Sequence, residues 1–411
     1  MEATIDALAR SESVNSSVLT DGMNEGKVVI FKAPPNGRPV AVGKGLKIKV
    51  NANIGTSGDV HDEDLELRKL EAAVKAGADA VMDLSTGGNL RSVRKKIVSA
   101  SDIPVGSVPI YEAIVKSVRE KGGGEKMTAE EMLDAIRLHG EDGISFVTVH
   151  CGVTRAVLDR LEKSPRVCGI VSRGGSFLAR WMRINGVENP LYERFDDVLD
   201  ICKQYGMVLS LGDGLRPGAV ADSLDAAQLE ELMTLGELNR RAVAAGVQAV
   251  IEGPGHVPID QIPTQMLLQK RLCDDAPFYV LGPLVTDVAP GLDHLTSAIG
   301  GAIAGCHGAD FLCYVTPSEH LGLPGVEDVR MGVLSARAAG HAADLVRRIP
   351  GAWAWDFEMS KARKERDWAR QIEMALDPDL AREIRAKTCD QDHETCSMCG
   401  DLCAYKADSC V

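Results

Sequence analysis

The sequence lacks three features that would have pointed to particular classes of protein. Its formal net charge is −13 and its Lys and Arg residues are scattered, which disfavours a nucleic-acid surface, because phosphate binding depends on clustered basic residues. No apolar run approaches the roughly 20 residues of a membrane-spanning helix, and the first ten residues show no basic segment followed by an apolar one. We therefore expect a cytoplasmic protein that acts on a small molecule and binds neither nucleic acid nor a membrane.

A repeated strand-and-helix pattern fills most of the chain. An apolar fraction of 45% supports a full core, and helical stretches such as 226–245 separate the short apolar runs, with Leu229, Leu232, Met233 and Val243 expected on one buried face. The GxGxxG fingerprint of a doubly wound sheet is absent. A (β/α)8 barrel of the TIM type is therefore the predicted fold. The candidate strands are 47–53, 80–83, 105–111, 145–150, 169–171, 208–211, 247–251, 278–281 and 310–315.

The pattern predicts four regions. Residues 1–45 are expected to form an irregular lead-in, and residues 46–326 the catalytic barrel. Residues 327–388 are expected to be helical, with one helix over 359–376 and another over 377–387, which begins with an acidic residue and a proline. Residues 389–411 form a cysteine-rich tail.

Polar residues follow nearly every candidate strand. Polar residues often end strands, but the repetition around the whole barrel favours a functional site, because barrel enzymes place their chemistry where strands meet the following loops. The two glycines after Arg173 also suit a loop whose backbone approaches a phosphate. The strand-end residues are Asn51, Asn53, Asp83, Tyr111, His150, Ser172, Arg173, Asp213, Glu252, His256 and Asp287.

Five of the eleven cysteines fall within the last 23 residues, at positions 389, 396, 399, 403 and 410. Cys396, Cys399 and Cys403 form a C-x2-C-x3-C pattern, which suits three corners of a 4Fe-4S cluster with one iron left open. A structural zinc site is the alternative, with a fourth ligand from Cys389, His393 or Cys410. The spacing favours the cluster.

Other candidate groups lie within the barrel. His256 and His320 could hold a divalent metal, although a structural role is the commoner one for a single histidine. Glu252, Asp213 and Arg216 are candidates for substrate anchoring or proton transfer, or else for salt bridges at the barrel mouth. Cys151 could be reactive, but a small buried residue is the commoner case.

A series of motifs, in order, resembles the phosphomethylpyrimidine synthases of thiamine biosynthesis over about residues 20–405. The motifs are VNANIGTS, VMDLSTG, VPIY, VSRGGS, LGDGLRPG, IEGPGHVP, LCYVTPSEHLGLP and CSMCG. The resemblance implies a radical S-adenosylmethionine lyase that acts on 5-aminoimidazole ribotide. It also implies a homodimer of barrels in which each cluster-bearing tail crosses to the other subunit, and a reductant protein such as flavodoxin or ferredoxin.

The resemblance also implies roles for individual residues. Glu252 would be catalytic, His256 and His320 would bind zinc, and Cys396, Cys399 and Cys403 would bind the cluster. Reduction of the cluster would cleave S-adenosylmethionine to a 5′-deoxyadenosyl radical. The ribotide site would consist of Asn53, Met82, Tyr111, His150, Ser172, Arg173, Gly174, Asp213, Gly214, Leu215, Arg216, Glu252 and Tyr279.

Three departures from the family pattern bear on the product. The family's HAG is replaced by His150, Cys151 and Gly152, and its GYDH has Leu292 in place of tyrosine. The tail spacing is x2 then x3, where long forms have x2 then x4. Shorter members of the family also use x3, so the lost tyrosine and the gained thiol are the grounds on which we favour the paralogue 5-hydroxybenzimidazole synthase of cobalamin biosynthesis, with the thiamine enzyme second. Cys151 is the candidate for the residue that quenches the final radical. A ribotide-binding protein and an electron-transfer module are the non-enzymatic alternatives.

Overall fold

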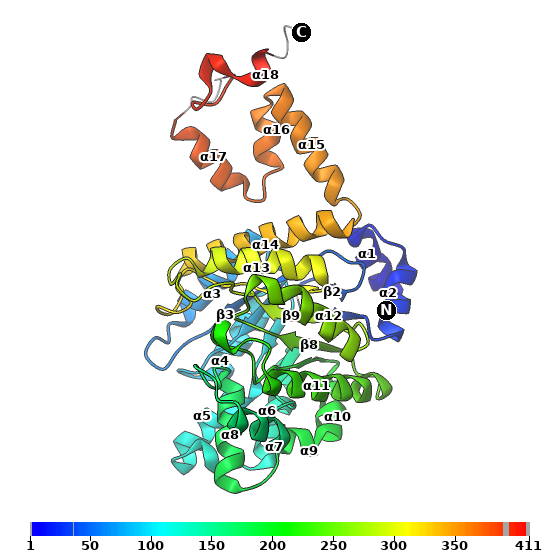
Figure 1. The fold of residues 1–411 in the computed structure, drawn as a ribbon, viewed down its shortest axis with the longest axis vertical. Helices are drawn as coiled ribbons and strands as arrows, with labels where there is room; N and C mark the ends of the chain where they lie inside the picture. Colours follow the sequence, from blue (N-terminus) through cyan, green and yellow to red (C-terminus); the bar gives the residue numbers. More distant parts are fainter. Residues whose placement is uncertain (1, 36, 389–393, 408–411) are drawn as a thin grey trace. The chain divides into compact units, whose positions relative to one another are not determined.

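The computed structural model describes residues 2–35, 37–388 and 394–407. The chain divides into two compact units, Met1–Asp344 and Leu345–Val411 (Figure 1). The four regions expected from the sequence stay a prediction. No helix among the described residues is both long enough and apolar enough to cross a membrane.

Eight parallel strands close into a barrel within the first unit (Figure 1), which confirms the predicted TIM-type fold. Their order around the barrel is β10-β3-β4-β5-β6-β7-β8-β9, so consecutive strands are neighbours and β10 closes on β3. Most strand residues are buried on both sides, as parallel sheets covered by helices require. The strands are β3 Lys49–Ile54, β4 Ala80–Asp83, β5 Val105–Ser107, β6 Phe146–Val149, β7 Val208–Leu211, β8 Ala249–Gly253, β9 Phe278–Leu281 and β10 Phe311–Cys313.

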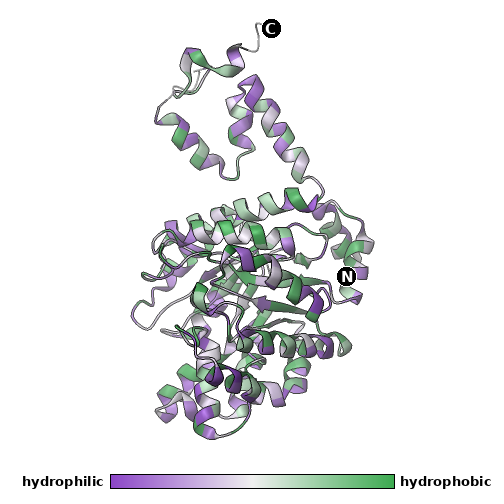
Figure 2. Cartoon of the chain, viewed as in Figure 1, coloured by the Kyte–Doolittle hydropathy of each residue, from purple (hydrophilic) through white to green (hydrophobic). Residues whose placement is uncertain are grey.

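The helices that cover the barrel show mixed hydrophilic and hydrophobic stretches, as amphipathic helices should (Figure 2). They are α3 Glu63–Ala76, α4 Leu90–Ala100, α5 Pro109–Lys121, α6 Ala129–Glu141, α7 Arg155–Lys163, α8 Arg173–Asn185, α9 Pro190–Glu193, α10 Phe195–Tyr205, α11 Ala226–Ala244, α12 Ile262–Leu272, α13 Asp293–His307 and α14 Val326–Arg347. Short 3-10 turns lie at Gly124–Lys126, Val220–Asp222 and Ile259–Gln261.

Two strand predictions were wrong. Residues 169–171 form a loop before α8, in which Gly169 has a φ of +63° and Val171 is exposed. The strand expected over 105–111 ends at Ser107, because Pro109 begins α5. Proline is well suited to a first helical turn, so this apolar run divides between a strand and a helix.

The N-terminal segment is ordered, although we expected it to be irregular. It contains α1 Glu2–Glu12, α2 Ser16–Asn24 and an antiparallel hairpin of β1 Val28–Phe31 with β2 Val40–Gly43. The Phe31 ring stacks on Phe146 with centroids 4.5 Å apart and lies 5.5 Å from Phe311. Phe146 and Phe311 begin β6 and β10, so the hairpin packs against the amino-terminal end of the barrel and leaves the opposite end for a ligand.

Helix α11 buries a different face from the one predicted. Met233 is exposed and Leu229, Leu232 and Val243 are only partly buried, whereas the inner face carries Ala227, Glu231, Leu235, Leu238 and Ala242. The apolar periodicity misled because an acidic residue occupies the inner face. Glu231 is 1% exposed.

The second unit contains α15 Ala352–Glu365, α16 Trp368–Glu373, α17 Pro378–Ala386, a 3-10 turn at Gly400–Leu402 and α18 Ala404–Ala407. The single helix expected over 359–376 is broken at Arg366, whose φ is +59°. The Asp367 side chain then accepts a hydrogen bond from the backbone N–H of Arg370 and caps α16. The helix expected over 377–387 is confirmed as α17, with Asp377 as its cap.

Candidate active site

A cavity of about 510 Å³ opens at the carboxyl end of the barrel strands. Eight of the predicted ribotide-site residues line it: Asn53, Met82, Tyr111, His150, Asp213, Arg216, Glu252 and Tyr279. They come from strands and turns all around the barrel and meet at one place, which is the arrangement that a substrate site in this fold requires.

Glu252 is held on the cavity wall by two hydroxyl groups. Thr148 Oγ1 and Ser210 Oγ each donate to Glu252 Oε1, at 2.7 and 2.6 Å. Thr148 lies on β6 and Ser210 on β7, so both donors are fixed by the barrel itself. Because both bonds use Oε1, the second carboxylate oxygen stays available to a bound substrate.

His150 lines the same cavity with a buried imidazole ring. Its Nε2 lies 3.2 Å from the Ser172 hydroxyl, whereas its buried Nδ1 has no hydrogen-bond partner among the described residues. Burial, assisted by the charge of Arg216, lowers the pKa of His150 to about 3. The imidazole is therefore neutral at physiological pH, and an orphaned polar atom of this kind suits contact with a ligand.

The Ser172–Gly174 turn lies directly beside His150, although it is not part of the cavity wall. A Cβ on Gly174 would lie 2.3 Å from His150 Cε1, so only glycine fits there. Ser172 caps α8 by accepting from the backbone N–H of Gly175. The Arg173 guanidinium lies 4.9 Å from the centroid of the Tyr111 ring, which brings a positive charge to the edge of the cavity.

The turn from Asp213 to Arg216 supplies one carboxylate and one guanidinium to the cavity. Arg216 Nη1 lies 3.8 Å from Asp213 Oδ1. Burial raises the pKa of Asp213 well above its usual range, against the lowering effect of Arg216. The backbone N–H groups of Gly214 and Leu215 point away from the cavity and donate to the Glu231 carboxylate, each at 2.8 Å.

The structure adds a cavity residue that the sequence did not indicate. Cys313 lines the cavity, and its Sγ accepts a hydrogen bond from Asn53 Nδ2 at 3.0 Å. Beside it, Asn51 donates to the Tyr279 hydroxyl at 2.7 Å. The register of the barrel could have shown this, because Cys313 pairs with Asn51.

His256 and His320 come together near this end of the barrel. Their ring centroids are 5.2 Å apart. His256 Nδ1 lies 2.7 Å from Asp287 Oδ1 and His320 Nδ1 lies 2.9 Å from Asp293 Oδ1. Carboxylates that hold Nδ1 and leave Nε2 free are typical of metal-ligating histidines.

The three tail cysteines lie on a compact series of turns. Gly400 N–H bonds the Cys396 carbonyl at 3.0 Å and Leu402 N–H bonds the Cys399 carbonyl at 3.0 Å. The backbone N–H groups of Cys399 and Met398 lower the pKa of the Cys396 thiol, and the neighbouring Cys396 raises the pKa of Cys399. A thiolate stabilised in this way fits cluster ligation.

Across residues 2–35, 37–388 and 394–407, no three His, Cys, Asp or Glu side chains are gathered closely enough to hold a metal ion. The histidine pair and the cysteine triad therefore both stay predicted ligand sets. Cys389, His393 and Cys410 lie outside the described residues.

Comparison with known proteins decides the family. A family model described as the radical SAM ThiC family matches residues 1–409. The chain belongs to this family. The chain is therefore an enzyme of the radical SAM type, and the family implies S-adenosylmethionine and an iron–sulfur cluster as cofactors.

Similar proteins with curated names share more than half of their residues with this member of the ThiC family. The phosphomethylpyrimidine synthase of Moorella thermoacetica is 55% identical over 404 residues, 98% of this chain and 94% of that protein. The phosphomethylpyrimidine synthase of Desulforamulus reducens is 55% identical over 402 residues, 97% of this chain and 93% of that protein. Among solved structures, the Yersinia pestis dihydropteroate synthase has a TM-score of 0.44 and 12% identity, covering 78% of this chain and 98% of that one.

Our preference for 5-hydroxybenzimidazole synthase is not supported within the ThiC family, because these relatives carry the name of our second choice. The two departures also lie away from the wall of the cavity. Cys151 is completely buried, outside the cavity, and burial raises the pKa of its thiol. Leu292, the lost tyrosine position, is 54% exposed and does not line the cavity either. Neither substitution changes the wall of the candidate site.

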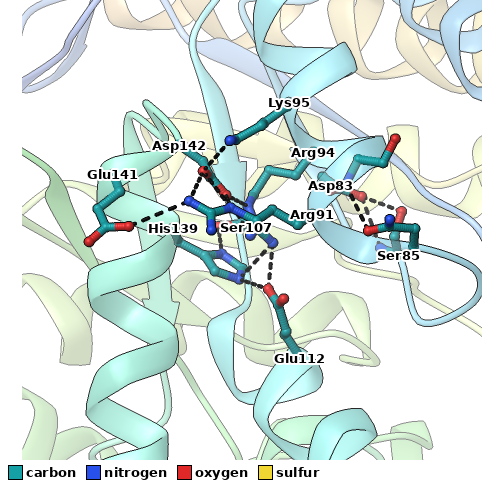
Figure 3. Close-up of polar contacts among 12 residues, drawn as sticks. Asp83, Ser85, Arg91, Arg94, Lys95, Ser107, Glu112, His139, Glu141 and Asp142 are labelled. Carbon is teal, nitrogen blue, oxygen red and sulfur yellow. Dashed lines mark hydrogen bonds and ion pairs between the residues drawn. The ribbon is translucent and has the colours of Figure 1, made fainter.

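A buried charge network supports the cavity from behind in this ThiC-family barrel (Figure 3). Arg94 of α4 donates to Glu112 at 2.6 Å and to Asp142 at 2.7 Å. His139 Nε2 lies 2.9 Å from Glu112, and its Nδ1 lies 2.7 Å from the Ser107 hydroxyl. Burial opposes ionisation of Glu112, but the contacts with His139 and Arg94 lower the pKa of Glu112 to about 2. Glu112 follows Tyr111 in the first turn of α5, so the network fixes a helix that carries a cavity residue.

Proposed function

We propose that this chain is a phosphomethylpyrimidine synthase, which converts 5-aminoimidazole ribotide to 4-amino-2-methyl-5-phosphomethylpyrimidine in thiamine biosynthesis. The observation that carries the proposal is the convergence of eight predicted ribotide-site positions on one cavity at the carboxyl end of the barrel. The names of relatives that match almost the whole chain support the same reaction.

The chain's own residues would bind and orient the ribotide. We assign the phosphate to Arg216, Arg173 and the N-terminus of α8, because guanidinium groups and free helical N–H groups both favour anions. Tyr111 and Tyr279 would pack against the imidazole and ribose, and the free Nδ1 of His150 would accept or donate one hydrogen bond. Glu252, held on Oε1 by Thr148 and Ser210, would move a proton through its second oxygen.

Two bound groups complete the proposed site. Cys396, Cys399 and Cys403 would hold a 4Fe-4S cluster, and His256 and His320 would hold a divalent metal such as zinc. When bound, the cluster and S-adenosylmethionine would supply the radical chemistry that removes hydrogen from the ribotide. Two imidazoles leave several metal positions open for water or substrate.

We also propose the partners and region boundaries that the resemblance and the sequence pattern imply. These are a homodimer in which the tail of one subunit serves the other, a flavodoxin or ferredoxin as reductant, and the division into 1–45, 46–326, 327–388 and 389–411. Equilibrium sedimentation of the reconstituted protein measures the first, and a monomer at micromolar concentration would contradict it.

The reaction is tested with anaerobically reconstituted protein, reductant, S-adenosylmethionine and 5-aminoimidazole ribotide. We expect 5′-deoxyadenosine and a pyrimidine phosphate by mass spectrometry. A benzimidazole product would overturn the proposed product, and the absence of 5′-deoxyadenosine would overturn the ligand assignment in the tail.

The ligand assignments have matched controls. Cys399→Ala should abolish the 4Fe-4S absorbance, whereas Cys168→Ala, at an exposed cysteine of the barrel unit, should retain it. His320→Gln should lower the bound metal per chain, whereas His307→Gln, whose Nδ1 bonds the Ile303 carbonyl, should not. A full cluster in Cys399→Ala, or full metal in His320→Gln, removes that residue from its ligand set.

A further inference from the structure

Glu231 is a buried carboxylate to which neither the sequence nor the family resemblance gave a role. It lies on the inner face of α11 and is 1% exposed. An acidic side chain is almost never fully buried unless its oxygens are paired. Glu231 is paired with backbone: Oε1 accepts from Gly214 N–H and Oε2 from Leu215 N–H, both at 2.8 Å.

The turn that Glu231 holds is also confined by its neighbours. A Cβ on Gly214 would lie 2.2 Å from Val153 Cγ2. A Cβ on Gly175 would lie 2.4 Å from the Gly214 carbonyl oxygen. The Gly214 backbone therefore lies between Val153 and the first turn of α8, with the Glu231 carboxylate bonded to its N–H.

The two ends of this turn point into the ribotide cavity, whereas Glu231 does not line it. Asp213 and Arg216 are cavity residues. Glu231 borders a second, small cavity, which it shares with Asp213 and Glu252. A displacement of the turn would therefore move the Arg216 guanidinium directly and the first turn of α8 through the Gly175 contact.

We infer that Glu231 is a positioning residue for ribotide binding, acting through the Asp213–Arg216 turn and the adjoining start of α8. This inference rests on the proposed function, since it concerns the same substrate. Both oxygens of a carboxylate can accept from the two N–H groups, whereas a carboxamide offers one oxygen and would set an N–H against the other. Burial raises the pKa of Glu231 to about 7, although the two N–H groups favour the charged form.

Glu231→Gln in the reconstituted holoenzyme tests the inference. We expect the dissociation constant and KM for 5-aminoimidazole ribotide to rise about tenfold or more, because one of the two charge-assisted bonds to the turn is lost, while kcat falls less. Glu230→Gln is the matched control, because Glu230 is on the same helix but pairs with Arg160 on the surface at 3.1 Å. The control should bind the ribotide like the wild type.

A double-mutant cycle separates positioning from general destabilisation. If Glu231 acts through the turn, the loss of affinity in Arg216→Gln/Glu231→Gln is smaller than the product of the two single losses. A loss equal to that product, or unchanged ribotide affinity in Glu231→Gln, overturns the inference. If Glu231→Gln does not fold, Glu231→Asp, which keeps the charge but shortens its reach, is measured instead, and wild-type affinity there also overturns it. Failure of the wild type itself to bind the ribotide would refute the proposed function.

Discussion

Arg216→Gln is the substitution that bears most directly on the proposed substrate. Arg216 lies on the cavity wall, 3.8 Å from Asp213, and is one of two arginines that we assign to the ribotide phosphate. Charge-assisted bonds from arginine to phosphate are among the stronger polar contacts in proteins. A loss of about 1.5–3 kcal/mol corresponds to a roughly 10- to 150-fold rise in the dissociation constant.

The assay is anaerobic titration calorimetry with 5-aminoimidazole ribotide, without reductant, so that binding is measured apart from the reaction. Arg180→Gln is the matched control, because Arg180 is exposed on α8 and does not line the cavity. Arg173→Gln should give a smaller loss than Arg216→Gln, since Arg173 is exposed at the cavity edge over Tyr111. Ribotide binding by Arg216→Gln within twofold of the wild type would refute the phosphate assignment.

Three further predictions follow from the geometry of the site and its support. Glu252→Gln should lower product formation at least about 100-fold, with a much smaller change in ribotide affinity, because the amide oxygen can still accept from Thr148 and Ser210; near-normal turnover would exclude proton transfer by Glu252. Cys151→Ala should leave turnover within about twofold of the wild type. Cys313→Ser, which removes the thiol from the cavity wall, should lower the yield of pyrimidine per 5′-deoxyadenosine. The reverse result would assign the quenching role to Cys151. Burial lowers the pKa of His139 to about 4, below its unfolded value of about 6.5. The contribution of neutral His139 to stability is therefore complete above pH 6.5 and is lost as the pH falls to 4. In urea unfolding, the free energy of unfolding should fall by up to roughly 3 kcal/mol over this range in the wild type, and this fall should be absent in His139→Gln.

The barrel and most of the polar residues that line its cavity could be predicted because both depend on local sequence. Each apolar run is short and bounded by glycine, proline or polar residues, and each polar strand end in a parallel barrel meets the others at one mouth. Glu252 and Asp213 were found in this way. The run at 169–171 failed because three apolar or small residues form too short a pattern to distinguish a strand from a loop. The N-terminal hairpin was not predicted because its packing partners, Phe146 and Phe311, are more than 100 residues away in the sequence.

The residues on the outer helices that support the site could not be predicted from a local sequence pattern. Glu231 and Glu112 each occupy a helix in which an acidic residue normally indicates a solvent-facing position. Their burial depends on partners from other segments: the Gly214 and Leu215 backbone in one case, and Arg94 with His139 in the other. Partners that come from distant segments cannot be read from the periodicity of one helix.

The two thiols near the site show why proximity in sequence is a weak guide to the product. Cys151 follows His150 immediately, but successive residues at the end of a strand point to opposite sides, so a thiol next to a cavity residue faces the helices and is buried there. Cys313 is more than 160 residues from His150 in the sequence. Yet its pairing with Asn51 places it on the cavity wall, within reach of Asn53. A substitution next to a cavity residue therefore bears on the reaction only when its own side chain also points into the cavity. The side chain of Cys151 does not line the cavity.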